Sequence, residues 1–156
     1  MEEKMIPVYL ITGFLEGGKT SFINFTMSQE YFADGEKTLL IVCEEGEEEY
    51  SESMLADNNT VMVTVKKLDR TYRPERVLIE YNGMWSVKKF LETQMPHYWG
   101  IYQIITILDG SSFQLYLNNI KSLAMELVTY TDLVIFNRCD ENTPLVTFQR
   151  SVKAVN

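Results

Sequence analysis

A doubly wound α/β fold with a mostly parallel sheet is predicted by two features of the sequence. Short apolar runs rich in β-branched residues recur along the chain, and longer segments with helical spacing separate them. A run that is apolar throughout is typical of a strand covered by helices on both faces. Strands that alternate with helices over crossover-length connections pair in parallel. Six such runs are present, at residues 7–11, 38–42, 61–65, 76–80, 104–108 and 133–136.

The predicted helices lie between these strands. We expect helices over residues 18–32, 86–94 and 112–129, because apolar residues recur there at helical spacing. The sequence shows no internal repeat and no linker long enough to divide it, and a length of 156 residues suits one domain. We therefore expect residues 1–156 to form a single domain.

The composition is that of an ordinary globular protein and argues against several classes of function. Hydrophobic residues make up 46% of the chain and charged residues 23%, which excludes a disordered or fibrous protein. The 14 basic and 22 acidic side chains give a net charge of −8, which repels phosphate backbones and predicts no nucleic-acid partner. The acidic N-terminus does not resemble a signal peptide, and no segment is apolar over the roughly 18 residues of a membrane span. A cytoplasmic protein without a membrane partner is expected.

The strongest functional signal directly follows the first predicted strand. Residues 13–20 read Gly-Phe-Leu-Glu-Gly-Gly-Lys-Thr, which fits the pattern G-x-x-x-x-G-K-[ST] between a strand and a helix. Glycines let backbone N–H groups point at phosphate oxygens, and the helix dipole adds partial positive charge. Lys19 is expected to reach the β- and γ-phosphates, and the Thr20 hydroxyl to bind Mg²⁺. The sequence therefore predicts a phosphate-binding loop.

A second signal lies at the end of the last predicted strand, where residues 137–140 read Asn-Arg-Cys-Asp. The Asp140 carboxylate can accept two hydrogen bonds from guanine N1–H and N2–H₂, and adenine offers no matching pair of donors. The Asn137 amide can bind the base edge and brace the loops. Asn and Asp also form turns at strand ends, but together with the phosphate loop the pattern favours guanine recognition.

Taken together, these patterns resemble those of the CobW-type P-loop GTPases, relatives of the nickel-insertion GTPases of hydrogenase and urease. Residues 7–20 are similar to the family's opening strand and loop, and residues 42–47 stand where the family has an Asn-Glu-Phe-Gly-Glu switch segment. Residues 78–83, Leu-Ile-Glu-Tyr-Asn-Gly, are similar to its Walker B variant. Residues 137–140 resemble its Asn-Lys-x-Asp guanine motif. The four stretches follow the family's order along nearly the whole chain.

The resemblance implies a Mg²⁺-dependent domain that binds GTP or GDP and hydrolyses GTP. Intrinsic turnover is expected to be slow, because the chain offers no obvious cis arginine finger. Switch segments would relay the nucleotide state to a protein client, or to the delivery of a metal or cofactor as in cobalamin biosynthesis. The P-loop class to which CobW-like proteins belong often dimerises across the nucleotide, so the resemblance also implies a nucleotide-dependent homodimer. The catalytic residues would be Lys19 and Glu80, and the metal-side residues Thr20, Glu44, Glu47 and Glu80. The nucleotide-binding residues would be Gly13, Gly17, Gly18, Lys19, Thr20, Ser21, Gly83, Asn137 and Asp140.

The sequence departs from the family pattern in several places. The Cys-x-Cys-Cys motif expected before the Walker B segment is absent, and the chain has two cysteines, Cys43 and Cys139. Since thiolates are the soft ligands that hold Zn²⁺, this argues against zinc or another transition metal at that motif. Arg138 stands where the family has lysine, and Ser51 where the switch segment ends in aspartate. Because 16 residues follow Asp140, we expect the chain to lack the family's C-terminal strand and C-terminal domain.

Two other functions would use the same loop. A small-molecule kinase or ATPase needs an arginine-rich lid, and the basic residues between positions 66 and 76 are scattered. A degenerate member would bind nucleotide to order a protein interface with negligible hydrolysis, which the acidic run at 44–49 and the missing thiols favour. Outside these motifs, the lone His97 is interpreted as structural or exposed and not as a metal ligand. Asp109 with Gly110, near the expected nucleotide side, is interpreted as a turn, with a role in the site as the alternative.

Overall fold

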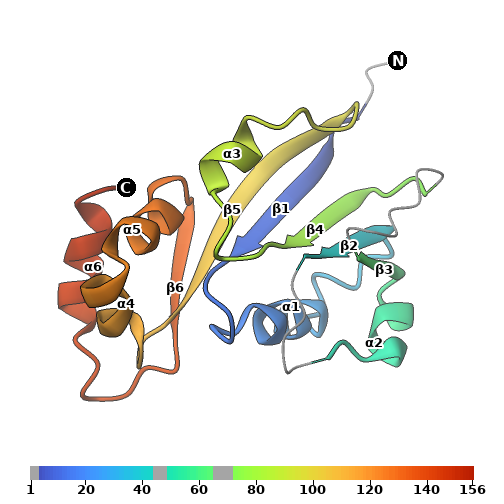
Figure 1. The fold of residues 1–156 in the computed structure, drawn as a ribbon. Helices are drawn as coiled ribbons and strands as arrows, with labels where there is room; N and C mark the ends of the chain where they lie inside the picture. The colour runs from blue at the N-terminus through green and yellow to red at the C-terminus, as the bar shows by residue number, and fades with distance from the viewer. Residues whose placement is uncertain (1–3, 44–48, 65–71) are drawn as a thin grey trace.

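The protein is built on one sheet of six strands in which every neighbouring pair is parallel (Figure 1). The structure is a computed structural model that describes residues 4–43, 49–64 and 72–156. The strands are β1 (Ile6–Thr12), β2 (Thr38–Val42), β3 (Thr60–Thr64), β4 (Arg76–Glu80), β5 (Trp99–Asp109) and β6 (Leu133–Asn137). Their spatial order is β3-β2-β4-β1-β5-β6, so the connection from β4 to β5 crosses β1. The doubly wound parallel sheet predicted from the sequence is confirmed.

The described residues form six helices around this sheet. They are α1 (Lys19–Met27), α2 (Glu52–Asp57), α3 (Val87–Leu91), α4 (Phe113–Asn119), α5 (Lys121–Thr129) and α6 (Leu145–Lys153). The helix expected over residues 112–129 is broken at Ile120, whose φ of −136° and ψ of 45° are not helical. The helix expected over residues 18–32 ends earlier, at Met27. None of the helices in the described ranges is long and apolar enough to cross a bilayer.

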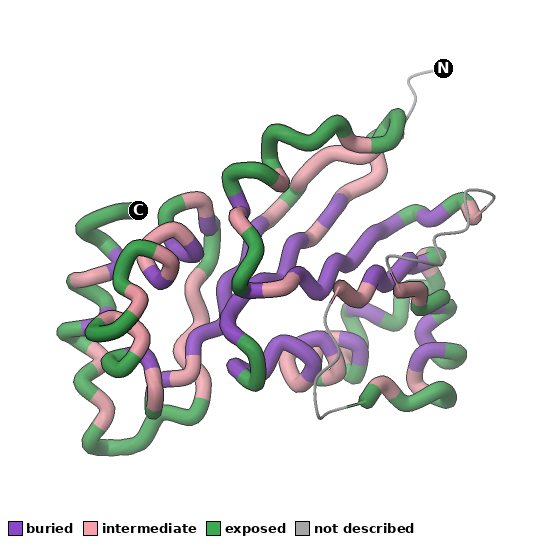
Figure 2. The backbone as a smooth tube through the Cα atoms, viewed as in Figure 1, coloured by how far each residue is buried: buried purple, intermediate pink, exposed green. Residues whose placement is uncertain are grey.

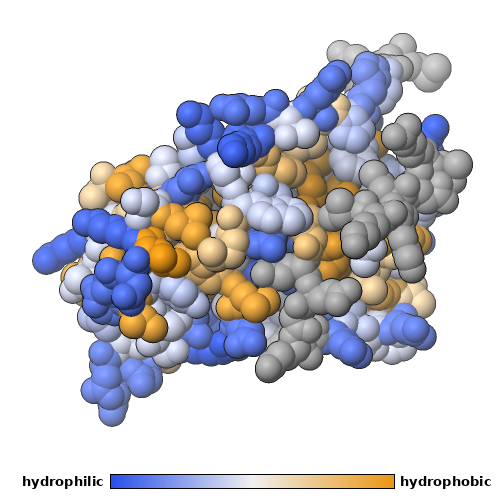
Figure 3. Space-filling view, in the orientation of Figure 1, coloured by the Kyte–Doolittle hydropathy of each residue, from blue (hydrophilic) through white to orange (hydrophobic). Residues whose placement is uncertain are grey.

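Each face of the sheet has its own hydrophobic core (Figure 2). On one face, Ile23 of α1 packs in a cluster with Leu40 and Leu78 of the sheet. On the other face, Phe113 and Leu127 belong to a cluster that includes residues of β1, β2 and β4. Successive residues of a strand point to opposite faces, so the continuous apolar runs supply both cores. Hydrophobic groups also reach the surface between the α4–α6 helices and the sheet (Figure 3).

The parallel arrangement places the carboxyl ends of the strands at one edge of the sheet. The loop after β1 begins at this edge, and Glu80, Asp109 and Asn137 are the last residues of β4, β5 and β6. Asp109 and Asn137 are opposite each other in the β5–β6 register. Open α/β sheets bind ligands outside the carboxyl ends of their strands. The fold therefore brings together the motifs that are separate in the sequence.

Candidate functional site

The loop between β1 and α1 lies tightly against β5. At Gly13 the φ angle is +137°, and a Cβ atom at this position would stand 2.1 Å from the carbonyl oxygen of Ile107. A residue with a side chain does not fit there, which is why glycine is required. Glu16 has a φ of +60°, and Gly18, the N-cap of α1, has a φ of +102°. These turns curl the backbone into the helix, as a phosphate-binding nest requires.

Lys19 is the first residue of α1, and its side chain folds back over the loop. Its Nζ donates hydrogen bonds to the carbonyl oxygens of Gly13 at 2.7 Å and Phe14 at 3.0 Å. The residue is 4% exposed, and a buried ammonium needs such acceptors. The positive charge is thus held across the loop at a helix N-terminus, where an anion is favoured. Phosphate oxygens bound here would compete with the two carbonyl groups for the ammonium.

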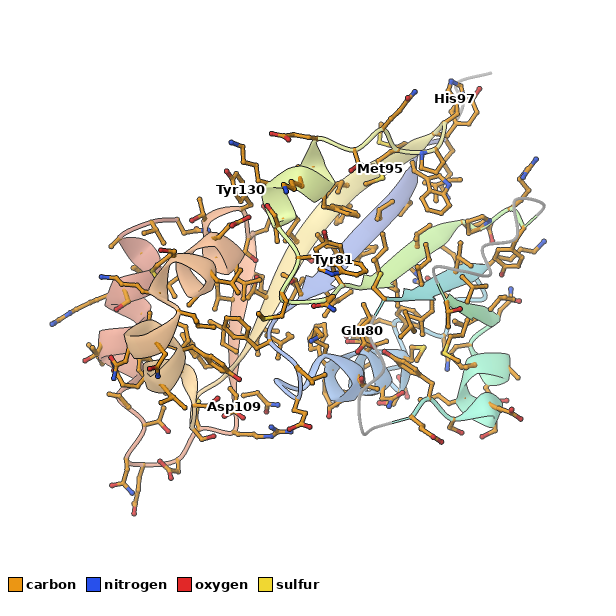
Figure 4. The ribbon with its side chains drawn as sticks, in the orientation of Figure 1. Glu80, Tyr81, Met95, His97, Asp109 and Tyr130 are labelled. Carbon is orange, nitrogen blue, oxygen red and sulfur yellow. The ribbon has the colours of Figure 1, made fainter. Side chains whose placement is uncertain are left out.

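Glu80 joins the loop to the end of β4 (Figure 4). The residue is 3% exposed, so its carboxylate is buried. The Thr20 hydroxyl donates to Oε1 at 2.9 Å, and the Tyr50 phenol donates to Oε2. Both oxygens of the buried carboxylate therefore have a donor, as a buried charge requires. Thr20 and Glu80, 60 residues apart in the sequence, act as one polar unit.

The Thr20 and Glu80 pair fits the chemistry of a magnesium site. Mg²⁺ prefers hard oxygen ligands and keeps several waters, so one or two protein oxygens suffice beside nucleotide phosphates. A hydroxyl has one donor and two lone pairs, and donation to Glu80 leaves the lone pairs of Thr20 for a cation. Glu44 and Glu47 lie outside the described residues. Within the described ranges, no three His, Cys, Asp or Glu side chains gather into a metal-holding group.

Gly83 packs directly against the start of the phosphate loop. A Cβ atom at this position would stand 2.1 Å from the carbonyl oxygen of Gly13 and 2.9 Å from Cα of Phe14. Both are backbone atoms, which move only if the loop moves. Just before it, the Tyr81 N–H donates to the carbonyl oxygen of Ile11 at 2.8 Å. The segment after β4 and the loop after β1 therefore form one packed unit.

The loop after β6 docks on the phosphate loop. Nδ2 of Asn137 donates to the carbonyl oxygen of Gly17 at 3.4 Å, and its Oδ1 accepts from the Arg138 N–H at 2.9 Å. The Arg138 guanidinium donates to the carbonyl oxygen of Glu16 at 2.6 Å. Arg138 has a φ of +52°, a turn conformation that suits this approach. The segments expected to hold the phosphates and the base are thus tied to each other.

Asp109 anchors the same guanidinium. Nη1 of Arg138 lies 3.0 Å from Oδ2 of Asp109, while Oδ1 accepts from the N–H and hydroxyl of Ser111 at 2.8 and 2.5 Å. Burial alone would raise the pKa of Asp109, but the bonds from Ser111 and Arg138 outweigh it and hold the pKa below its ordinary value. The Gly110 N–H donates to the carbonyl oxygen of Asn137 at 2.8 Å. The turn predicted at Asp109 and Gly110 is therefore also a support of the β6 loop.

Asp140 stands at the exposed end of this loop. Its Oδ1 accepts from the Asn142 N–H at 2.9 Å and from the Thr143 hydroxyl at 3.1 Å. These bonds orient the carboxylate, and an ionised carboxylate has about four acceptor sites, so it can accept further donors. Among the residues that the structure describes, no hydrogen bond joins Asp140 to the phosphate loop. Its expected role concerns the base and not the phosphates.

Most of the predicted site residues meet at this edge of the sheet. Ser21 lies in the first turn of α1, beside them. Residues with contacts in the site that no motif assigns to it include Tyr50, which reaches Glu80, and Asp109, which reaches Arg138. The position of Asp109 at a strand end is a signal once the strand order is known, whereas Tyr50 has none. The predicted residues that contact one another here are Gly13, Gly17, Gly18, Lys19, Thr20, Glu80, Gly83 and Asn137.

The family comparison covers most of the chain. The sequence model described as CobW/HypB/UreG, nucleotide-binding domain, matches residues 57–156, which is 100 of the 156 residues. This match includes the segment around Glu80 and the Asn137–Asp140 loop, and the phosphate loop precedes it. A search of the curated proteins gives no match.

Two solved structures resemble the fold over nearly all of the chain. They are the Zn(II)-bound YjiA GTPase from E. coli and a Zn(II)-bound triple mutant of the same GTPase. For each, the TM-score is 0.69 at 17% sequence identity, covering 96% of this chain and 54% of the other. The chain therefore spans about half the length of the structures it matches. A likeness at this identity concerns the fold.

Replacement of Gly83 by alanine is expected to disturb the phosphate loop, because the added methyl group meets backbone atoms of Gly13 and Phe14. The free energy of unfolding should fall by about 1–3 kcal/mol, the usual cost of overpacking, and guanine-nucleotide affinity should fall with it. Urea unfolding and fluorescence titration measure the two effects. The control is Gly100→Ala, where the new Cβ meets the flexible side chain of Met5 at 2.3 Å. Equal behaviour of the two variants would contradict the prediction.

Proposed function

Because this chain belongs to the CobW/HypB/UreG nucleotide-binding domain family, we propose that it binds GTP with Mg²⁺ and hydrolyses it slowly. The family and the fold make it a nucleotide-binding domain of the GTPase type with a P-loop NTPase fold. The observation that carries the finer proposal is the hydrogen bond from Thr20 to Glu80. P-loop hydrolases hold Mg²⁺ with the hydroxyl of the loop and an acid at the end of a neighbouring strand.

The phosphate loop supplies positioning and charge, which is most of what phosphoryl transfer needs. The backbone of Gly13, Gly17 and Gly18 surrounds the phosphates, and Lys19 neutralises charge on the β- and γ-phosphates. Mg²⁺, when bound, would neutralise further phosphate charge. Glu80 would hold the water shell of the metal or orient the attacking water. The buried position of Glu80 and its hydrogen bond to Thr20 support this assignment.

Residues farther along the chain are proposed to bind the base and to sense the γ-phosphate. Asp140 accepts hydrogen bonds from guanine N1–H and N2–H₂, and Asn137 binds the base edge while bracing the phosphate loop. Gly83 senses the γ-phosphate through its N–H, and Ser21 adds a hydroxyl in the first turn of α1. The close packing of Gly83 on Gly13 supports a coupling between the two loops.

We also propose that the nucleotide state is relayed through the segment after β2 to a protein client or to metal or cofactor delivery. Glu44 and Glu47 are the proposed acids of this switch, on the strength of the family pattern. The end of the segment is described, and there the Glu49 carbonyl oxygen accepts from Nδ2 of Asn24 in α1 at 3.5 Å. The YjiA structures hold Zn(II), but no thiolate zinc site is proposed here, since the Cys-x-Cys-Cys motif is absent from the sequence.

Titration with GTP, GDP and ATP in the presence of Mg²⁺ tests the proposal. Guanine nucleotides are expected to bind at least tenfold more tightly than ATP, a difference of about 1.4 kcal/mol. Lys19→Ala should lower the affinity for all three by more than tenfold, because the ammonium at the phosphates is lost. Lys89→Ala, at an exposed position of helix α3, is the control and should bind like the wild type.

The same titration separates the alternatives. A tenfold preference for ATP would favour the small-molecule kinase or ATPase. Tight GTP binding without hydrolysis in single-turnover assays would favour the degenerate binding module. A wild-type protein that ignores GTP and GDP at millimolar concentration would contradict the proposal itself.

Asp109→Asn is expected to weaken GDP binding about three- to tenfold, because the Arg138 guanidinium loses its ion pair at the β6 loop. Affinity for inorganic tripolyphosphate should fall less than that for GDP, since that ligand uses the phosphate loop, where Arg138 can keep its hydrogen bond to the Glu16 carbonyl oxygen. Isothermal titration calorimetry with both ligands measures the difference. A double-mutant cycle with Arg138→Ala should show coupling between the two residues. Additive effects of the two substitutions would argue against the anchor.

A further inference from the structure

We propose that Tyr50 is a positioning residue of the hydrolytic site: its phenol holds one oxygen of Glu80, so that the carboxylate presents the other to Thr20 and the metal side. The inference rests on the proposed function and adds a residue to it. Tyr50 stands between β2 and α2, within the segment that the family pattern assigns to the switch, but the pattern gives this residue no role of its own. It acts through Glu80 and not on the nucleotide directly.

The position of Tyr50 is set by packing as well as by its hydrogen bond. The ring packs, partly buried, against the hydrophobic cluster between α1 and the sheet, which contains Ile23 and Leu78. The phenol reaches Oε2 of Glu80, 30 residues away in the sequence. On the other side, Ser51 is the N-cap of α2 and accepts from the Met54 N–H. The packing of the ring and the start of α2 directly after it therefore fix the position of the phenol, which can in turn fix the carboxylate of Glu80.

The burial of Glu80 makes the second donor important. A buried carboxylate oxygen without a donor is costly, and among the residues that the structure describes, side-chain donors reach this carboxylate from Thr20 at Oε1 and from Tyr50 at Oε2. The terminal torsion of a glutamate is broad, so a carboxylate held at one oxygen alone can turn. Two donors on different oxygens fix its plane. Loss of the phenol would therefore release the orientation of Glu80.

The orientation of Glu80 in turn determines that of the Thr20 hydroxyl. The hydroxyl proton points at Oε1, which turns the lone pairs away from Glu80. Those lone pairs are the proposed ligand for Mg²⁺. Residues that hydrogen-bond to metal-site groups typically change metal affinity or activity 10- to 100-fold when they are replaced. Tyr50 is such a residue, because it hydrogen-bonds to Glu80 of the Thr20–Glu80 pair.

The test compares Tyr50→Phe, which removes the hydroxyl alone, with Tyr50→Leu, which also removes the ring. Full-length protein loaded with GDP is titrated with Mn²⁺ and followed by electron paramagnetic resonance. Tyr50→Phe is expected to bind Mn²⁺ about tenfold more weakly than the wild type. Its GDP affinity in excess chelator should be unchanged, because the phosphate and base loops keep their contacts. The single-turnover rate of GTP hydrolysis should fall, and the Mg²⁺ concentration for half-maximal rate should rise.

The matched control is Tyr72→Phe, since that phenol donates to the carbonyl oxygen of Thr38 at 3.4 Å, at the start of β2. This control should keep wild-type Mn²⁺ affinity. Equal Mn²⁺ affinity in Tyr50→Phe and the wild type overturns the inference. So does a Tyr50→Phe protein that resembles Tyr50→Leu in losing GDP affinity without metal, because the role is then structural. A wild type that binds no GDP overturns the proposed function, and the inference with it.

Discussion

The backbone at Gly13 is the constraint on which the rest of the site depends. On one side, the carbonyl oxygen of Ile107 in β5 leaves no room for a side chain at Gly13, and on the other side Gly83 lies against the Gly13 carbonyl group. The ends of β1 and β5 and the segment after β4 therefore meet at one residue. This meeting follows from the strand order, because β1 lies between β4 and β5. Lys19 then binds the same carbonyl oxygen and sets its ammonium across the loop.

Charged side chains around this point are paired across segments that are distant in the sequence. Glu80 of β4 accepts from Thr20 of α1, and Arg138 after β6 binds Asp109 at the end of β5. A buried charge that loses its partner is costly, so the Glu80 pair favours one arrangement of the loops; the Arg138 pair is more exposed and contributes less. Groups held in place before the substrate binds need little reorganisation during the reaction. The pairing that stabilises the loops would thus also prepare them for the proposed phosphate chemistry.

The sequence predicts the parts of this structure that depend on local pattern. All six strands were predictable from continuous apolar runs, which reflect burial on both faces in β2 and β4, whereas the edge strands β3 and β6 are partly exposed. The break between α4 and α5 at Ile120 was not predictable, because apolar residues keep their helical spacing through it. Helix α2 was not predictable either, because it is shorter than the window over which helical periodicity can be recognised. In the site, the positions of Lys19 and Thr20 were predictable from the residue spacing within one loop motif. The contact of Tyr50 with Glu80 depends on strand order and on packing, which no local pattern encodes.

Two departures from the family pattern, at positions 138 and 51, fall at links between segments. Arginine in place of lysine at position 138 gives a planar group whose Nη1 bonds both the Glu16 carbonyl oxygen and the Asp109 carboxylate. Serine in place of aspartate at position 51 caps α2, directly after the tyrosine that reaches Glu80. A chain that changes such residues keeps the fold, because the core clusters lie elsewhere. It alters which loops are tied together, and position 51 lies at the end of the segment after β2, through which the relay of nucleotide state is proposed to pass.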